Sequence, residues 1–425
     1  MPTPEATKLL ALLGTFALLI GTFKYKVCLP SAYLVIIVTK LGIYYPVLAQ
    51  IRFELIIVIF ALLVIMVSEE KAELLSLERS KILRYMFFFL VIIFVSMIQA
   101  FDIARSWDRI YIEILPNCVF IALLLVFCRQ QKDIRFFLWT FGIVTAWLGY
   151  EPIYRYLHGD LVNTLGGFDY AVAEAGLVRG HTSLAHYLLQ GMPILWYLSI
   201  ASKNILEKLV GFGLFAFCFW GVLISGARGG MVGLVVIGVL ISLLSDRPIL
   251  MMISCFVAIF AALTAMGGEY LARMVSILQF GKSGLSAQSR IDGLTHGIEM
   301  LIRRPILGVG PGCYPVARKA WFDWSLWSHN HYGQLAGELG ILGIIIWGLF
   351  ARQYIKSSWV MRKSLTIDPW IKSIATAILV TSGTRLALGM FDHSVFKTIW
   401  YMLAAIVVVF EGLTIKTALA INDKS

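Results

Sequence analysis

The chain has 425 residues, of which 59% are hydrophobic and only 14% are charged, and its mean hydropathy is +0.82. Soluble globular domains average roughly 45–50% apolar and about 25% charged residues, so the composition excludes an ordinary soluble domain and indicates a polytopic helical membrane protein. The formal net charge of +11 is explained largely by basic loops, as membrane topology requires. It does not indicate nucleic-acid binding.

Apolar runs long enough to cross a bilayer as helices recur along nearly the whole chain. The first run, Leu9 to Thr22, follows Lys8 and has no clear small-residue cleavage site, so we interpret it as a retained span. The predicted spans begin near Leu9, Leu29, Phe53, Met86, Leu115, Phe136, Leu184, Val210, Gly230, Ile249, Tyr332, Ser373 and Thr398. We therefore expect about twelve transmembrane helices (twelve or thirteen crossings), with the layout of the first fifty residues left open.

The loops between the spans fall into two kinds by charge. Four are rich in Lys and Arg and should face the cytoplasm; these are 68–85, 129–135, 202–208 and 352–372. The alternate loops, which should face the other side, are 102–113, 152–183, 225–229, 268–330 and 389–397. All seven histidines lie in or beside these outward loops, which suggests chemistry on the outer face.

The long outward loop divides the chain into three predicted parts. These are transmembrane helices over 1–267, an outward loop region over 268–330, and C-terminal transmembrane helices over 331–425. The loop is itself basic, although long translocated loops obey the charge rule only weakly. Its positive charges suggest an anionic partner.

An amphipathic helix is predicted inside this loop. Ile291, Leu294, Ile298 and Ile302 recur at helical spacing, and Pro305 should end the helix. We expect the helix to lie against the membrane or to cap a cavity. The glycine-rich run that follows should form a turn, and without a flanking βαβ unit it does not indicate a dinucleotide site.

Arg228 stands between two apolar runs that are joined by almost no loop. It should therefore lie at or inside the outer membrane face, where an unpaired charge costs a few kcal/mol. No acidic residue lies near it in the sequence. Two interpretations remain: the side chain reaches lipid headgroups, or it binds a substrate phosphate, for which a guanidinium is well shaped.

Two further arginines and a histidine stand at outward span boundaries. Arg179 precedes one span and is an interfacial cation or an anion ligand; Arg290 opens the amphipathic helix and pairs with a carboxylate or binds an anion. His329 precedes the span near Tyr332 and is a catalytic base or one more interfacial polar residue. Together with Arg228 they could form one outward pocket that holds a lipid-linked pyrophosphate beside a general base.

The remaining polar candidates are less specific. Glu338, inside the span, either orients groups in the site or pairs within the helix bundle. His329 and His331 could in principle bind zinc, but residues two apart on a helix point to different faces. The outward acidic residues form no clustered pair of the kind that divalent cations prefer, so we expect no metal and no cofactor. The aromatic run 321–327 is an interfacial belt or a surface that stacks on sugars.

The run His329-Asn330, nine residues, then Gly340-x-x-Gly343 resembles the signature of the O-antigen ligase family. Two segments upstream, 305–310 and 225–229, resemble other recurrent segments of that family. O-antigen polymerases and protein O-oligosaccharyltransferases share the signature. The resemblance implies a GT-C-like helical fold and lipid-linked glycan donors.

By this resemblance His329 is the catalytic residue, Arg228 and Arg290 contact the donor pyrophosphate, and Arg179 is a further contact. Asn330 and Glu338 would support the site. The implied reaction is a metal-independent, inverting transfer of a glycan from undecaprenyl pyrophosphate to a sugar hydroxyl of lipid A–core oligosaccharide. It would take place at the periplasmic face of a bacterial inner membrane.

The expected partners are the undecaprenyl pyrophosphate-linked glycan, the lipid A–core acceptor and membrane lipids, with no nucleic acid. A polymerase is the less favoured relative, because only one outward loop is large. A protein glycosyltransferase is also less favoured, because the chain ends soon after the last span. A lipid-linked glycan flippase or exporter is the alternative from a different class.

Overall fold

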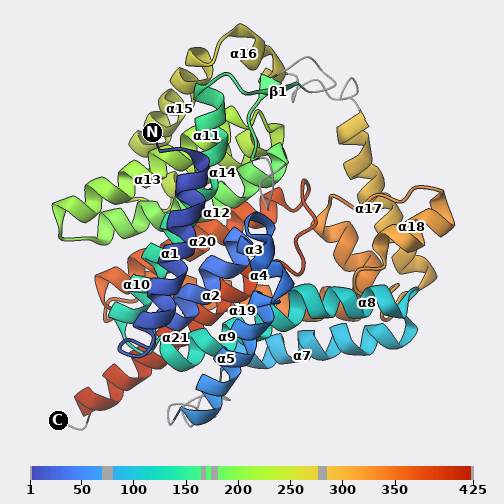
Figure 1. Cartoon of the computed structure of the whole chain (residues 1–425), viewed down its shortest axis with the longest axis horizontal. Coiled ribbons are helices and arrows are strands. Elements are labelled where there is room, and N and C mark those ends of the chain that lie inside the picture. The colour runs from blue at the N-terminus through green and yellow to red at the C-terminus, as the bar shows by residue number, and fades with distance from the viewer. Residues whose placement is uncertain (1, 69–79, 164–168, 174–179, 276–284, 423–425) are drawn as a thin grey trace. The chain divides into compact units, whose positions relative to one another are not determined.

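The computed structural model describes residues 2–68, 80–163, 169–173, 180–275 and 285–422 (Figure 1). Most of these residues are helical. The strands among them are two residues long, β1 (Val162–Asn163) and β2 (Asp169–Tyr170), and pair antiparallel. An all-α polytopic membrane architecture fits this structure.

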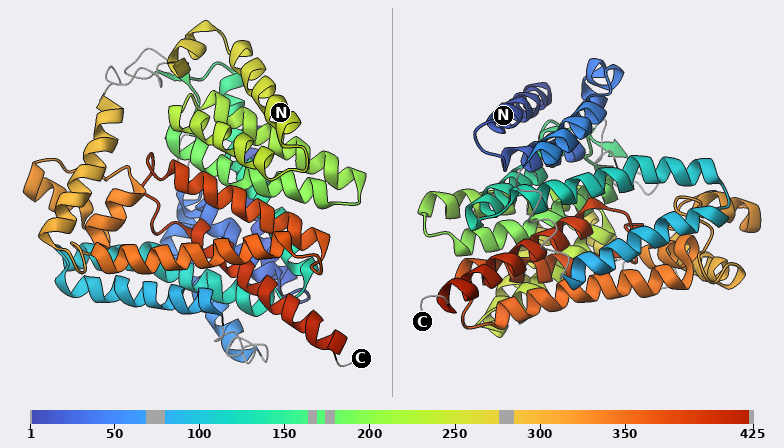
Figure 2. Two further views of the ribbon diagram at one scale, coloured as in Figure 1. Left: turned by 180° about the vertical axis from the view of Figure 1, so that it is seen from behind. Right: turned by 90° about the horizontal axis from the view of Figure 1, so that it is seen from below.

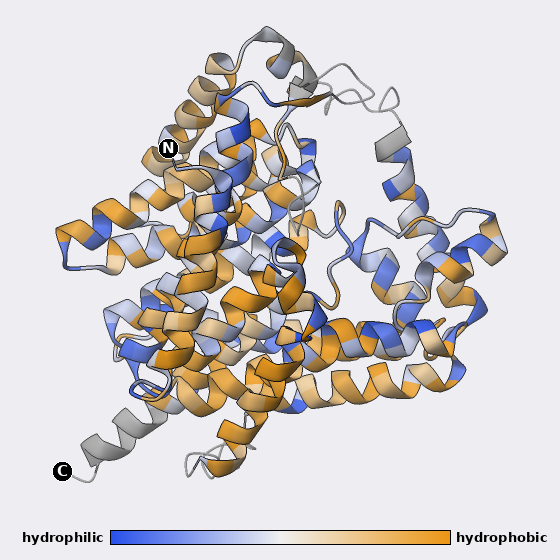
Figure 3. Ribbon diagram, in the orientation of Figure 1, coloured by the Kyte–Doolittle hydropathy of each residue, from blue (hydrophilic) through white to orange (hydrophobic). Residues whose placement is uncertain are grey.

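Seven helical stretches in the described residues are long and apolar enough to span a membrane. They are α1 (Pro4–Gly21), α7 with η2 (Lys81–Gln99), α8 to α9 (Ile103–Phe127), α13 (Ile205–Ile224), α15 (Pro248–Ala265), α19 (His331–Lys363) and α20 (Pro369–Leu388). Shorter apolar helices are α2 (Cys28–Thr39), α5 (Phe53–Val67), α14 (Arg228–Leu243) and the first part of α21 (Thr398–Asn422). Figure 3 shows the hydrophobic residues along α5 and α7.

The other helices are α3 (Leu41–Tyr44), α4 (Pro46–Gln50), α10 (Gln131–Leu148), α11 (Tyr150–Leu157), α12 (His181–Ala201), α16 (Gly268–Val275), α17 (Leu285–Arg303) and α18 (Tyr314–Phe322). Each predicted span coincides with one helix of the structure. The number of membrane crossings stays a prediction.

Contacts divide the chain into two compact units, each assembled from segments far apart in the sequence. Unit 1 comprises Met1–Ser68, Val126–Leu278 and Ser358–Arg385, and unit 2 comprises Glu69–Leu125, Gln279–Ser357 and Leu386–Ser425. In unit 1, α12 packs along α13, α10 and α14. In unit 2, α17 and α18 lie side by side, as both Figure 1 and Figure 2 show.

The predicted loop 102–113 is wrong, because the structure is helical from Ile103 onward. Asp102 caps α8 by accepting a hydrogen bond from the backbone N–H of Arg105 at 3.0 Å. Arg109 and Glu113, one turn apart, form an ion pair. These contacts satisfy the charges locally, so a polar segment continues as a helix, partly as the π-helical turn η3 (Ile110–Ile114). The predicted loop 352–372 likewise begins too early, because α19 continues to Lys363.

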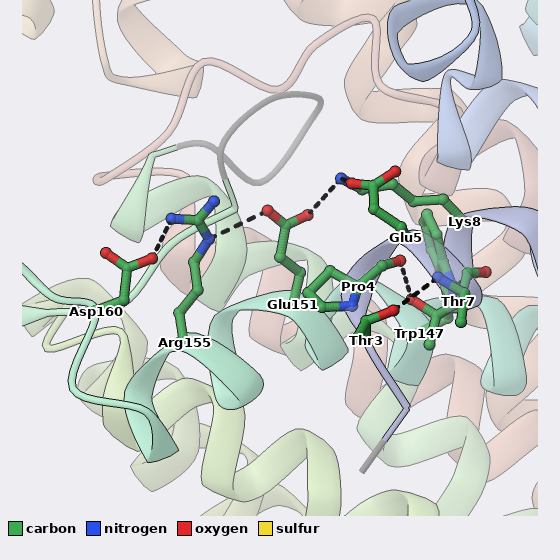
Figure 4. A network of polar contacts seen from close by, with 10 residues as sticks. Thr3, Pro4, Glu5, Thr7, Lys8, Trp147, Glu151, Arg155 and Asp160 are labelled. Atoms are coloured by element: carbon green, nitrogen blue, oxygen red, sulfur yellow. Dashed lines mark hydrogen bonds and ion pairs between the residues drawn. The ribbon is translucent and has the colours of Figure 1, made fainter.

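A chain of alternating charges ties the start of α1 to α11 within unit 1 (Figure 4). Glu151 lies between two cations: its Oε2 is 3.8 Å from Lys8 Nζ, and its Oε1 is 3.2 Å from Arg155 Nε. Arg155 also pairs with Asp160, and Lys8 Nζ is 2.7 Å from Glu5 Oε1. Because Lys8 and Glu151 are both buried, each needs the other in place.

This network sets the direction of α1. The Tyr150 hydroxyl donates to the Pro2 carbonyl at 2.6 Å, which brings the start of α1 to the C-terminal end of α10. At the opposite end of α10, Arg135 pairs with Glu207 near the start of α13. The beginning of α1 and the segment that follows α11 therefore lie at one end of unit 1, and residues 202–207 lie at the other.

We predict that cysteines introduced at Thr3 and Leu157 are labelled by an impermeant maleimide from the same side of the membrane. A cysteine at Lys203 should be labelled from the opposite side. All three positions are exposed, and the native cysteines, none of them exposed, give the background in the unaltered chain. Labelling of the Thr3 and Lys203 positions from one side would contradict this orientation of α1.

Candidate active site

His329 lies in the turn between α18 and α19, with a backbone φ of 46°. The polar contacts of its neighbours hold the turn. The Asn330 side-chain oxygen accepts from the backbone N–H of Gly333 at 3.0 Å, which caps the first turn of α19. Ser328 Oγ donates to the Asn330 carbonyl at 2.8 Å. Ser328 and Asn330 are wholly buried, whereas the His329 side chain between them is exposed.

We predict that Asn330→Ala lowers the stability of the protein by about 1 kcal/mol, because α19 loses its cap. Asn330→Ser keeps a neutral accepting oxygen at the cap and should cost less. Thermal unfolding of the detergent-solubilised protein measures the difference. Equal unfolding midpoints for the two variants would show that the cap contributes nothing.

The ring of His393, in the 389–397 segment, lies beside His329. The ring centres of His329 and His393 are 5.4 Å apart in an edge-on arrangement, and His393 stacks on Trp327 at 5.3 Å with an interplanar angle of 6°. The Arg109 guanidinium carbon is 4.6 Å from the centre of the Trp327 ring. Burial lowers the pKa of His393 to about 3, so this neighbour of His329 is neutral near neutral pH.

Helix α17 carries Arg290 and crosses the His329 turn at glycines. A Cβ atom added to Gly293 would lie 1.7 Å from the Ser328 carbonyl oxygen, and one added to Gly297 would lie 2.3 Å from that of Gly333. Only glycine allows backbones to approach this closely. The contact fixes α17 against the turn, with Arg290 less than one helical turn before Gly293.

The buried face of α17 therefore differs from the expected apolar stripe. The helix itself and its end before Pro305 are confirmed, since α17 ends at Arg303. However, Ile291, Ile298 and Ile302 are exposed, and the buried positions include Gly293, Gly297 and Met300. The physical reason is that the contact is made by backbone rather than by large side chains.

The surroundings of the His329 imidazole favour its neutral form. The side chain is exposed, but partial loss of surrounding water and then the positive charge of Arg290 lower the pKa of His329 below its usual 6.5. Arg318 acts in the same direction, and Asp392 opposes it. The ring is therefore neutral near neutral pH and has a nitrogen able to accept a proton.

Glu338 is wholly buried on α19 and accepts a hydrogen bond from the start of α18. Its carboxylate accepts from the backbone N–H of Tyr314, the first residue of α18, at 3.3 Å, and from Gln334 Nε2 at 3.2 Å. Gln334 Oε1 in turn accepts from the Val395 N–H at 3.3 Å. These contacts favour the interpretation that Glu338 pairs within the bundle.

His331 packs inside unit 2. It is 1% exposed, its Nδ1 lies 3.0 Å from Ser394 Oγ, and its ring contacts Trp347 at 4.5 Å. Within the described residues, no group of three or more His, Cys, Asp or Glu side chains could hold a metal ion.

The predicted arginines lie in different parts of the chain. Arg290 and His329 belong to unit 2. Arg228 is the first residue of α14 in unit 1, half-buried between the buried Ala227 and Gly229. Arg179 lies outside the described residues, just before α12. A single pocket that gathers all four residues stays a prediction.

The tryptophans of the aromatic run each contact a guanidinium within unit 2. The distances from guanidinium carbon to ring centre are 4.9 Å for Arg303 and Trp321 and 4.6 Å for Arg318 and Trp324. Trp327 contacts Arg109 in the same way, so its ring is already engaged by protein groups. Arg318, His393 and the α17 glycines escaped the sequence analysis, because only the folded chain brings them to the His329 turn.

The fold and this turn define a class: a helical membrane protein with an accessible neutral histidine beside a cation. Such a site can take a proton from a hydroxyl next to an anionic group. Residues 213–348 match the family model described as O-Antigen ligase. This segment includes Arg228, Arg290 and His329. This match supports the predicted assignment to the O-antigen ligase family and, in general terms, a ligase- or polymerase-type function. No curated protein matches the chain.

Proposed function

We propose that the protein is an O-antigen ligase-like glycosyltransferase of a bacterial inner membrane with a GT-C-like fold. It would transfer a glycan from undecaprenyl pyrophosphate to a sugar hydroxyl of lipid A–core oligosaccharide at the periplasmic face. The observation that carries the proposal is the accessible His329 imidazole, with its lowered pKa and Arg290 nearby, inside the segment that matches the family.

In the proposed reaction, neutral His329 removes the proton of the acceptor hydroxyl as that oxygen attacks the anomeric carbon of the donor glycan. The new glycosidic bond forms while the bond from the anomeric carbon to the phosphate oxygen breaks. Undecaprenyl pyrophosphate leaves with the electron pair, and the anomeric centre is inverted. His329 then releases its proton to water or to the departing phosphate.

The arginines would stabilise the charge that develops on the leaving pyrophosphate. Arg290 is the arginine of this set that shares unit 2 with His329. By the resemblance to the family, Arg228 would also contact the pyrophosphate, with Arg179 as a further contact. Guanidinium groups supply the neutralising charge that a divalent cation supplies elsewhere, so we propose a metal-independent reaction. Transfer that stops in the presence of a chelator would count against it.

A reconstituted transfer assay tests the proposed function. Full-length protein in vesicles receives the lipid-linked donor together with two competing acceptors, lipid A–core and a second molecule of lipid-linked glycan. Transfer to lipid A–core supports a ligase, and lengthening of the lipid-linked glycan indicates a polymerase. Transfer only to added protein would indicate a protein glycosyltransferase. Movement of donor across the membrane without a new glycosidic bond would overturn the enzyme proposal in favour of a flippase.

A further inference from the structure

Arg318 is a buried cation that holds the residues leading into His329. Its side chain is wholly buried on α18 in unit 2. Nη1 donates to the carbonyl oxygens of Leu326 at 3.3 Å and Trp327 at 3.1 Å. One guanidinium therefore holds two consecutive carbonyls, the second of which is two residues before His329.

The positive charge of Arg318 is not required to hold these two carbonyl groups. Its hydrogen bonds in the described structure go to neutral acceptors, and Nη2 is buried without a hydrogen-bond partner among the described residues. Stacking on Trp324 repays part of the desolvation. A buried cation without a hydrogen-bonded carboxylate is costly, and a neutral amide could hold carbonyl groups at lower cost. The retained charge therefore calls for a second role.

The partner on α17 shows how Arg318 is held in place. Arg318 Nε donates to His296 Nδ1 at 2.9 Å, and the His296 ring stacks on Phe322 at 4.1 Å with an interplanar angle of 2°. His296 Nδ1 must carry no proton in order to accept this bond. Burial and the charge of Arg318 lower the pKa of His296, which is consistent with that form.

We propose that Arg318 is the positioning residue of the His329 base: its guanidinium holds the Leu326 and Trp327 carbonyls and thereby fixes the turn that carries His329. In addition, a nearby cation disfavours a second positive charge on His329, so the charge of Arg318 adds to that of Arg290 in lowering the pKa of His329. The charged and titratable groups that face His329 are Arg290 on α17, Arg318 on α18, and Asp392 and His393 in the 389–397 segment. The inference rests on the proposed base role of His329.

Two substitutions separate the fork from the charge. Arg318→Lys keeps the cation but cannot hold two carbonyls and His296 at once. Arg318→Met removes both and retains a long apolar stem. Arg303→Lys is the matched control, because Arg303 also stacks on aromatic rings, at Trp321 and Phe322, and is exposed. Each variant is purified as the full chain, and its unfolding midpoint is measured first.

The first readout is the pH dependence of kcat/KM for transfer. Arg318→Lys should lower kcat/KM by on the order of 10-fold to 100-fold through misplacement of His329, with the acidic midpoint near that of the unaltered protein. Arg318→Met should in addition move that midpoint to higher pH. Arg303→Lys should retain both the rate and the midpoint.

The second readout does not depend on catalysis. Diethyl pyrocarbonate modifies neutral imidazole, so its rate at His329 as a function of pH, resolved by peptide mass spectrometry, reports the pKa of that ring. The Arg318→Met profile should move to higher pH. An unmoved profile would overturn the contribution of the Arg318 charge, and an Arg318→Lys variant with unaltered kcat/KM would overturn the positioning role. Full transfer activity of His329→Ala would instead overturn the proposed function, and the modification profile would still report on Arg318.

Discussion

Replacement of His329 by alanine is expected to lower the rate of glycan transfer by on the order of 10²- to 10⁴-fold, the usual contribution of a general base. The turn should survive the change, because Ser328 and Asn330 make its hydrogen bonds and the His329 side chain is exposed. The initial rate of transfer in reconstituted vesicles measures the loss. Donor binding by the variant should persist, since the arginines are untouched.

His158→Ala is the matched control for this loss. His158 is also exposed and stacked on an aromatic ring, that of Tyr154 at 4.0 Å, but it lies in unit 1. It should transfer glycan at the unaltered rate. A His329→Ala variant that transfers glycan as fast as His158→Ala would remove the base from the proposed mechanism.

The kcat/KM of the unaltered protein should fall as the pH is lowered. Burial of the ring and Arg290 lower the pKa of His329, so the protonated, inactive form accumulates only below 6.5. kcat/KM should therefore be constant near neutral pH and fall roughly tenfold per unit of pH below that pKa. Transfer rates at donor and acceptor concentrations below saturation, recorded as a function of pH, give this kcat/KM profile. A midpoint above 6.5 would contradict the described surroundings of the ring.

The second large effect is expected at the glycine contact between α17 and α19. A methyl group at residue 297 would lie 2.3 Å from the Gly333 carbonyl oxygen and 2.6 Å from its Cα, both rigid backbone atoms. Gly297→Ala should therefore push α17 away from the turn and carry Arg290 with it. Displacement by about 1 Å is enough to lower transfer by about 100-fold.

Gly348→Ala adds the same atom to α19 where nothing lies within 4 Å of it. Alanine is the better helix former by about 1 kcal/mol, so this control should retain activity and stability or gain stability. Thermal unfolding and transfer rates of the two variants are compared. Equal activity in both would show that the close approach of α17 is not needed for the site.

The apolar helices could be predicted because bilayer length and apolar composition leave few alternatives. The predicted starts from Leu9 to Thr398 coincide with helices of the structure. The prediction failed at 102–113, where charge alone suggested a loop. Neighbouring contacts, such as the Arg109–Glu113 ion pair, allow a charged segment to remain helical, and the spacing of such a pair is visible in the sequence.

The site was predictable only where a residue stands out from its surroundings. His329 and Arg290 do so at the edges of apolar runs. Arg318 does not, because with Lys319 beside it the position suggests an exposed basic pair. Gly293 and Gly297 interrupt an apolar pattern whose isoleucines drew attention to the other face of α17. Their function depends on a crossing between segments that local sequence does not encode.

The break in α19 explains the spacing between His329-Asn330 and Gly340. At Gly340 the backbone leaves the helix, with φ of 64° and ψ of −162°. The next two N–H groups pair with the carbonyls of Pro305, at 2.8 Å, and Ile306, at 3.3 Å. The nine residues between Asn330 and Gly340 therefore set the length of the helix from its cap at Asn330 to its break at Gly340. One inserted residue would rotate everything beyond it by about 100°, so natural members with this architecture should vary the residue types there but keep the length.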